Sequence, residues 1–200
     1  MGREKIGIDI DDVLARSAEG FAEYSNRKWG GRHRAENYTE NWAEFWGISP
    51  ELASERAEEF HAEGIVSQYR HFESAIPVLK RLYIDRDLVA ITSRRLTIKA
   101  DTDAWIERYF SGLFKEVCYA GIWDSNAHID HKIKQTKAEV CREHGVNYLI
   151  DDQIKHCLSV AEVDIHALLF GNYRWNNTKK LPQDVTRVKD WPAVLQYFYE

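Results

Sequence analysis

The sequence lacks the signals of several protein classes. Its three cysteines form no Cys-x-x-Cys pair, and its eight histidines show no spacing typical of zinc sites. The odd cysteine count indicates free thiols in a reducing compartment rather than a disulfide-bonded fold. No apolar run is long enough to cross a bilayer, and the first apolar segment begins too early to leave room for a signal peptide. We therefore expect a cytoplasmic protein without a membrane segment.

An excess of positive charge is also missing. Lys and Arg together number 27 against 32 Asp and Glu, which gives a formal net charge of −5. This balance argues against binding of a nucleic acid polymer, but it is compatible with a small phosphorylated substrate held at one site. There is no internal repeat and no low-complexity segment.

Apolar and aromatic residues, by contrast, are abundant. The chain is 44% hydrophobic and contains seven Trp, ten Tyr and eight Phe, which is ample for a packed core. Its length of 200 residues fits one domain with an elaboration, or one domain with a small insert. A disordered chain is therefore excluded.

The segment KIGIDIDDVL at residues 5–14 carries the first functional signal. A short apolar run bounded by charge is typical of a buried parallel strand, and this one ends in Asp9, Asp11 and Asp12. If the chain stays extended, Asp9 and Asp11 lie on one face because side chains two positions apart point the same way. Two close carboxylates repel each other unless a cation, a shared proton or backbone donors offset the repulsion. A polar loop after the strand is the alternative, since Asp is common in turns.

Polar side chains also follow later apolar segments. Thr92 and Ser93 end one such segment, and Asp151 and Asp152 follow another. In parallel sheets, ligands bind beyond the carboxyl ends of the strands at a switch in strand order, so these groups are expected to meet at one site. Besides the first strand, we predict strands at residues 87–93, 114–120, 146–150 and 166–170.

Helical segments alternate with these strands. Ser17 is expected to cap the first helix, although Gly20 lowers its helix propensity. The alternation predicts an α/β fold, a Rossmann-like parallel sheet with helices on both faces. Because no strand is evident between the first strand and residue 87, the early helices are interpreted as a cap over the site: we predict a core of residues 1–15 and 75–200 and a helical cap of residues 16–74. Helices are expected at residues 17–29, 50–63, 76–82, 97–110, 134–144, 154–161 and 191–198.

The expected site has the groups needed for phosphoryl transfer. Two carboxylates from one strand and another from a distant strand make a hard-oxygen site suited to Mg²⁺. Hydroxyls and a lysine beside it would hold phosphate oxygens and neutralise developing charge. Asp9 is placed to attack phosphorus and form an aspartyl-phosphate. Asp11 is placed to protonate the leaving alcohol and later to take a proton from water.

The order of these groups resembles a known pattern. Asp9-Ile-Asp11-Asp-Val, Thr92 at a strand end, Lys137 and then Asp151-Asp152 are similar to the four motifs of the haloacid dehalogenase-like (HAD) superfamily of phosphohydrolases, over nearly the whole chain. Within it, the sequence most resembles the 5'(3')-deoxyribonucleotidases and their uncharacterised prokaryotic relatives. The support is the Asp-x-Asp-x-Val form of the first motif, Ile-Thr-Ser, Leu-Ile-Asp-Asp and the helical insert after the first motif. The resemblance implies a HAD-like fold with a small cap and a Mg²⁺-dependent nucleotidase-like phosphomonoesterase.

The resemblance also implies roles for individual residues. Asp9 would be the nucleophile and Asp11 the general acid and base. Mg²⁺ would be held by the Asp9 carboxylate, the Asp11 backbone carbonyl and Asp152, because the second aspartate of the fourth motif is the usual ligand. Asp151 would then support the metal through water.

Further residues would bind the phosphate. The resemblance assigns this to Thr92 and the Ser93 backbone. It assigns the catalytic lysine to Lys137, with Lys134 and Lys132 as alternatives.

Two residues depart from the deoxyribonucleotidase pattern. Asp12 stands where Gly is usual, and Arg94 stands where Pro is usual. Both lie at the phosphate end, so they bear on substrate choice more than on chemistry. Arg94 and Arg95 are either surface charges or phosphate contacts; their place at a strand end favours contact, and we count Arg94 as substrate-binding.

Four aromatic residues gather in the expected cap: Tyr38, Trp42, Phe45 and Trp46. They form either the core of the cap or a platform on which a nucleobase stacks, and the core interpretation is favoured.

Three other functions are compatible with clustered aspartates. A phospho-receiver domain also uses Asp, Thr and Lys at strand ends, but its lysine follows the acidic groups, whereas Lys137 precedes Asp151. A haloacid dehalogenase needs only the first aspartate, so the presence of Asp11 favours a phosphatase. A non-catalytic binding protein is disfavoured by the intact set of groups. The physiological substrate and a homodimeric state are left open.

Overall fold

Within the described part of the chain, one sheet of six parallel strands forms the centre of the molecule. The structure is a computed structural model that describes residues 2–121, 135–178 and 180–200. The strand order is β3-β2-β1-β4-β5-β6, and every neighbouring pair is parallel. The direction of winding reverses between β1 and β4, so a crevice is expected at their carboxyl ends. The strands are β1 (Lys5–Ile8), β2 (Asp87–Thr92), β3 (Glu116–Tyr119), β4 (Tyr148–Asp151), β5 (His166–Phe170) and β6 (Val185–Val188).

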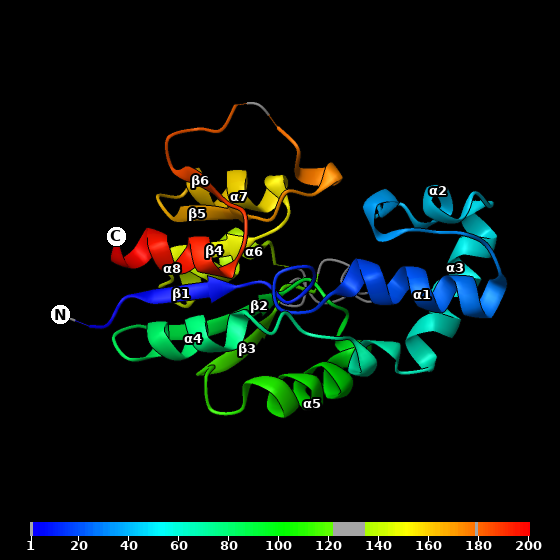
Figure 1. Cartoon of the computed structure of the whole chain (residues 1–200), viewed down its shortest axis with the longest axis horizontal. Coiled ribbons are helices and arrows are strands. Elements are labelled where there is room, and N and C mark those ends of the chain that lie inside the picture. The colour runs from blue at the N-terminus through cyan, green and yellow to red at the C-terminus, as the bar shows by residue number, and fades with distance from the viewer. Residues whose placement is uncertain (1, 122–134, 179) are drawn as a thin grey trace.

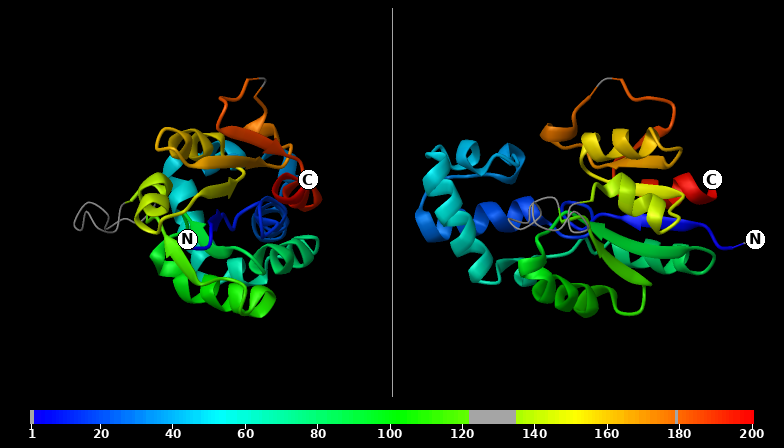
Figure 2. Two further views of the ribbon diagram at one scale, coloured as in Figure 1. Left: turned by 90° about the vertical axis from the view of Figure 1, so that its left-hand side faces the viewer. Right: turned by 180° about the vertical axis from the view of Figure 1, so that it is seen from behind.

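Helices cover both faces of this sheet. α4 packs beside α8 on one face, and α6 packs beside α7 on the other (Figure 2). This arrangement confirms the predicted α/β, Rossmann-like fold. The helices are α1 (Ser17–Trp29), α2 (Trp42–Trp46), α3 (Pro50–Ala62), α4 (Ala75–Tyr83), α5 (Lys99–Phe110), α6 (Lys137–Glu143), α7 (Ile154–Ala161) and α8 (Trp191–Tyr199). Among the residues described, none of these helices is long and apolar enough to cross a membrane.

The strands divide their side chains between two apolar clusters. Leu88 and Ile150 belong to the cluster beneath α4 and α8, whereas their neighbours Val89 and Leu149 belong to the cluster beneath α6 and α7. This is the period-two alternation of a sheet that is buried on both faces. Burial on both faces fixes the register, because a slip by one residue would exchange the two faces.

The helices α1, α2 and α3 lie beyond the carboxyl ends of the strands (Figure 1). The chain enters and leaves this helical region through two adjacent segments that hydrogen-bond to each other. The Arg16 amide donates to the Arg70 carbonyl, and the Phe72 amide donates to the Leu14 carbonyl, both at 2.8 Å. The cap bounds at residues 16 and 74 stay a prediction, and these hydrogen bonds lie close to them.

An aromatic cluster joins the three helices α1, α2 and α3. The ring of Phe21 has its centroid within 5.7 Å of the centroids of five other rings, which come from α2, α3 and the segment before α2. Because aromatic residues bury large apolar areas, this cluster can hold a region that contains no sheet. The five rings are those of Tyr38, Trp42, Phe45, Trp46 and Phe60.

Some local predictions were wrong. Ser17 is the first residue of α1 rather than its cap; the cap position is Arg16, which has no side-chain capping bond. α5 begins at Lys99, after a short 3-10 turn. The five-residue α2 and the four-residue strand β6 were not predicted, because segments this short carry little periodicity.

Gly20 lies inside α1 for a packing reason. A Cβ atom at this position would lie 2.6 Å from Cε1 of Tyr69, whose side chain is buried. The tyrosine ring fills the space that a side chain at residue 20 would need. The low helix propensity of glycine is therefore offset by the close approach of the 3-10 segment before Tyr69 to α1.

We expect Gly20→Ala to destabilise the protein by up to about 2 kcal/mol, because overpacking costs about 1–3 kcal/mol and alanine gains only about 1 kcal/mol in helix propensity. Urea unfolding followed by circular dichroism measures this change. The double variant Gly20→Ala/Tyr69→Leu should lose less than the sum of the two single variants. A stabilising Gly20→Ala, or strict additivity, would contradict the packing explanation.

Candidate active site

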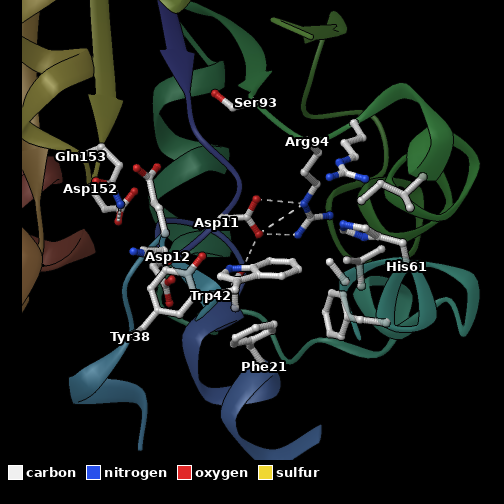
Figure 3. A pocket seen from close by; sticks show the side chains of 18 of the residues that line it. Asp11, Asp12, Phe21, Tyr38, Trp42, His61, Ser93, Arg94, Asp152 and Gln153 are labelled. Atoms are coloured by element: carbon white, nitrogen blue, oxygen red, sulfur yellow. Dashed lines mark hydrogen bonds and ion pairs between the residues drawn. The ribbon is translucent and has the colours of Figure 1, made fainter. Parts of the chain in front are cut away.

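A cavity of about 430 Å³ lies between the strand ends and the helices α1, α2 and α3 (Figure 3). Of the eight site residues predicted from the sequence, six line it: Asp9, Asp11, Ser93, Arg94, Lys137 and Asp152. The other two, Thr92 and Asp151, are fully buried behind its wall. The structure therefore brings the groups from β1, β2, β4 and α6 together at the carboxyl edge of the sheet, where parallel α/β folds bind ligands.

Lys137 joins two buried carboxylates. Its Nζ lies 2.8 Å from Asp9 Oδ1 and 2.6 Å from Asp151 Oδ2, and the lysine side chain is only 1% exposed. Lys137 is the first residue of α6, whose start is fixed by a capping box between Thr136 and Glu139. The alternatives Lys134 and Lys132 lie outside the described residues.

The ionisation of this group follows from its burial. Burial raises the pKa of Asp9 to about 7, although the Lys137 ammonium acts to lower it. For Lys137, burial would lower the pKa, but the carboxylates of Asp151 and Asp9 outweigh it and the pKa is raised. A divalent cation beside Asp9 would favour its ionised form further.

Three carboxylates offer a site for such a cation. Oxygens of Asp9, Asp151 and Asp152 lie within 4.8 Å of one another, and all three residues are buried. Lys137 Nζ donates to Asp151 Oδ2, and the Gln153 backbone amide donates to Asp151 Oδ1. No hydrogen bond from the described residues reaches Asp9 Oδ2 or Asp152 Oδ1. An all-oxygen set in which two carboxylate oxygens are not engaged by any described residue fits Mg²⁺, which prefers one or two carboxylates together with water.

Asp11 is held on the cap side of the site. Arg94 Nη2 donates to Asp11 Oδ1 at 2.7 Å, Arg94 Nε donates to Asp11 Oδ2 at 3.0 Å, and the Ser17 hydroxyl also donates to Oδ1 (Figure 3). Burial acts to raise the pKa of Asp11, but the Arg94 guanidinium outweighs it and the pKa is lowered. In this arrangement Asp11 is an ionised acceptor. Contact of Arg94 with a phosphate stays a prediction, because its Nε and Nη2 are engaged by Asp11 and its Nη1 donates to Thr102.

The hydroxyls at the end of β2 are used differently. Thr92 Oγ1 accepts the Arg94 amide at 3.1 Å and so shapes the turn after the strand. Ser93 Oγ is buried and has no hydrogen-bond partner among the described residues, although Ser93 lines the cavity. A buried hydroxyl without a partner is costly, so a ligand oxygen is the expected acceptor.

Comparison with known proteins places the chain in a family. A family model described as "5' nucleotidase, deoxy (Pyrimidine), cytosolic type C protein" matches residues 3–197. The chain belongs to this nucleotidase family. It is accordingly a phosphoric monoester hydrolase, in agreement with the resemblance seen in the sequence.

Solved structures show the same fold. A haloacid dehalogenase-like hydrolase from Streptococcus pneumoniae has a TM-score of 0.69 and 16% identity, with 98% of both chains covered. A predicted phosphatase from Clostridium acetobutylicum has a TM-score of 0.70 and 12% identity over 99% of both chains. An L-2-haloacid dehalogenase from Xanthobacter autotrophicus has a TM-score of 0.64 and 10% identity over 98% of both chains. A search of curated proteins finds no match.

The cap aromatics of this nucleotidase divide into two groups. Phe45 and Trp46 are buried, and the Trp46 indole donates to Ser25 Oγ at 2.9 Å. Tyr38 and Trp42 line the cavity instead. Phe45 and Trp46 therefore belong to the core alone, whereas Tyr38 and Trp42 pack on Phe21 and also line the cavity.

The sequence reasoning missed the loop that follows β5. In this loop, Trp175 donates its indole N–H to Asp152 Oδ2 at 2.6 Å, and the Tyr173 hydroxyl donates to the Asp12 carbonyl at 2.7 Å. His61 and His156 also line the cavity, and burial lowers the pKa of each to about 4. One indication of this loop is present in the sequence: it follows the carboxyl end of a predicted strand, and ligands of parallel sheets bind beyond these ends.

Asp12 occupies a backbone conformation that explains why glycine is usual there. Its φ is 54°, in the left-handed region that residues other than glycine rarely adopt. Its carboxylate accepts the Ala18 amide at 3.1 Å, which satisfies a free donor in the first turn of α1. Aspartate thus tolerates the strained position and supplies a bond that glycine cannot.

We expect Asp12→Ala to lower the free energy of unfolding by about 1–3 kcal/mol, because alanine is strained at this φ and leaves the Ala18 amide unpaired. Asp12→Gly should lose less, since glycine relieves the strain while it removes the same bond. Urea denaturation of the two variants measures the difference. Equal losses in both would show that the backbone conformation contributes nothing.

Proposed function

We propose that this nucleotidase is a Mg²⁺-dependent phosphomonoesterase that acts through an aspartyl-phosphate on Asp9, with pyrimidine deoxyribonucleotides as its substrates. The observation that carries the proposal is the state of Asp9. One of its oxygens is bound by Lys137, no hydrogen bond from the described residues reaches the other, and Asp9 lines the cavity. A carboxylate fixed through one oxygen presents the second in a single orientation, as a nucleophile requires.

The residues around Asp9 support this chemistry. Asp9 and Asp152 would hold Mg²⁺, with Asp151 in support and with the Asp11 backbone carbonyl as a further ligand. The cation would neutralise phosphate charge that otherwise repels Asp9. Ser93 and Lys137 would hold the phosphate oxygens, with Ser93 offering the hydroxyl that has no partner among the described residues. Thr92, which is buried behind the wall, would support the turn that presents Ser93.

Asp11 would act on the leaving group and on water. It begins as an ionised acceptor held by Arg94 and Ser17. To protonate a leaving alkoxide it has to bind a proton and turn from Arg94, whereas it can accept a proton from water as an ionised group. The ion pair with Arg94 therefore affects protonation of the leaving alkoxide more than removal of a proton from water.

The side chains at the two ends of the cavity are suited to the two ends of a nucleotide, the phosphate and the base. Its strand end carries aspartates, Ser93 and Lys137, and its cap end carries the rings of Phe21, Tyr38 and Trp42 together with polar side chains such as Glu40 and Asn41. A phosphate at one end and a flat, weakly polar base at the other would meet chemically matched surfaces. The family description names pyrimidine deoxynucleotides and the cytosol, and we extend both to this protein.

Asp9 and Asp11 should fail in different ways when replaced. We expect Asp9→Asn to abolish turnover and to form no phosphoryl-enzyme. Asp11→Asn should slow hydrolysis of alkyl phosphates by about 10²- to 10⁴-fold but still accept phosphate from p-nitrophenyl phosphate, because a phenolate leaves unaided. The aspartyl-phosphate should then accumulate as a burst, measured by rapid quench and intact mass.

Two controls complete this experiment. Asp184 is exposed and does not line the cavity, so Asp184→Asn should behave as the wild type. EDTA should abolish wild-type turnover, and Mg²⁺ should restore it. Full turnover in metal-free buffer, a phosphorylated Asp9→Asn protein, or equal slowing of aryl and alkyl substrates by Asp11→Asn would contradict the proposal.

Trp42 and Trp46 provide a test and its control for the proposed base-binding wall of the cavity. Trp42→Ala should raise KM for nucleotides while turnover of p-nitrophenyl phosphate stays near the wild-type value, because Trp42 lines the cavity. Trp46→Ala should instead lower the free energy of unfolding by about 3–5 kcal/mol, as buried aromatic truncations do. Steady-state kinetics and thermal unfolding separate the two effects. Equal losses on all substrates in Trp42→Ala would remove it from the substrate wall.

A further inference from the structure

Trp175 connects the metal end of the site to the cap. Its indole N–H donates to Asp152 Oδ2 at 2.6 Å, which is short for a bond from nitrogen. Gln153 Nε2 donates to the same oxygen at 3.1 Å. Both donors act on Oδ2, and no donor from the part of the chain that the structure describes reaches Asp152 Oδ1.

The indole is itself held in a fixed position. The ring of Trp175 is stacked on that of Tyr173, with centroids 4.5 Å apart and an angle of 4° between the planes. Gly171 allows this packing, because a Cβ atom there would lie 2.7 Å from Cδ2 of Tyr173. The backbone beside it is fixed by Asn176, which is 1% exposed and donates to the carbonyls of Asp152 and Phe170 at 2.9 and 2.8 Å.

Trp175 also contacts a residue in the wall of the cavity. The ring of Tyr38 meets the indole edge-on, with centroids 5.5 Å apart, and Tyr38 lines the cavity. The neighbouring Arg174 donates to Asn37 Oδ1 at 3.1 Å. A continuous set of contacts thus runs from the cap wall, through Tyr38 and Trp175, to the Asp152 carboxylate.

We propose that Trp175 is a positioning residue for Mg²⁺, which fixes Asp152 so that Oδ1 meets the cation. The inference rests on the proposed function, since it takes Asp152 to be a ligand. A donor that orients a metal-bound carboxylate is expected to strengthen metal binding, and its loss typically weakens the affinity 10- to 100-fold. Trp175 itself touches neither metal nor substrate in this role.

The test is Mg²⁺ binding by the free enzyme, measured by isothermal titration calorimetry. Trp175→Phe keeps an aromatic ring against Tyr173 and Tyr38 but removes the N–H donor. We expect the Kd for Mg²⁺ to rise about tenfold or more, and the loss of activity at low Mg²⁺ to be recovered at high Mg²⁺. Trp175→His retains a ring N–H donor, so we expect it to bind Mg²⁺ more tightly than Trp175→Phe.

A matched control exists in the cap. The Trp29 indole also donates to a carboxylate, Glu59 Oε2, at 3.2 Å, but Trp29 does not line the cavity. Trp29→Phe should leave the Mg²⁺ affinity unchanged. Wild-type affinity in Trp175→Phe, equal weakening in Trp29→Phe, or equal weakening in both Trp175 variants would overturn the inference alone. A wild-type protein that binds no Mg²⁺ would overturn the proposed function, and the inference with it.

Discussion

A buried ammonium between two buried carboxylates is the interaction on which the site depends. Lys137 contacts Asp9 at the end of β1 and Asp151 at the end of β4, and all three side chains are nearly inaccessible to solvent. Removing one partner from such a group leaves an uncompensated buried charge, which is strongly destabilising. The group forms only if β1 and β4 pair in register, as Ile8 and Ile150 do, and if α6 begins at Lys137. Sheet register, helix capping and the proposed chemistry therefore specify the same arrangement.

The sequence predicts this edge of the molecule well, because its signals are local. Apolar strands that end in Asp9, Thr92 and Asp151 can be read from short windows, and a parallel sheet then brings their ends together. The partner of Arg94 could not be found in this way, since Asp11 lies 83 positions away and nothing in the local pattern points to it. The same holds for Trp175, whose partners Asp152, Tyr173 and Tyr38 come from the segment after β4, from its own loop and from the cap. Contacts between loops leave no periodicity in a sequence.

Arg94 shows how a departure from a family pattern can be accommodated. A buried guanidinium needs a counter-charge, and Asp11 provides it with both carboxylate oxygens. The remaining surroundings are also suited to a cation: Thr102 accepts a hydrogen bond, and the rings of Tyr69 and Trp105 lie within 6.0 Å of the guanidinium carbon. These partners come from three different segments. A change from proline to arginine at this position therefore involves the cap-facing side of the site and not the turn alone.

The paired chain segments at the base of the cap have a consequence for the history and redesign of the molecule. The Leu14–Phe72 and Arg16–Arg70 hydrogen bonds bring the start and the end of the intervening stretch to neighbouring positions. A stretch whose two ends already meet can be shortened, lengthened or exchanged for another without moving the strands on either side, because closing a longer loop costs little additional entropy. The carboxyl edge of the sheet, with its aspartates, can then stay the same while the cap that covers it is replaced. The same hydrolytic residues can in this way act on substrates of very different size, because the exchangeable segment determines which substrates fit.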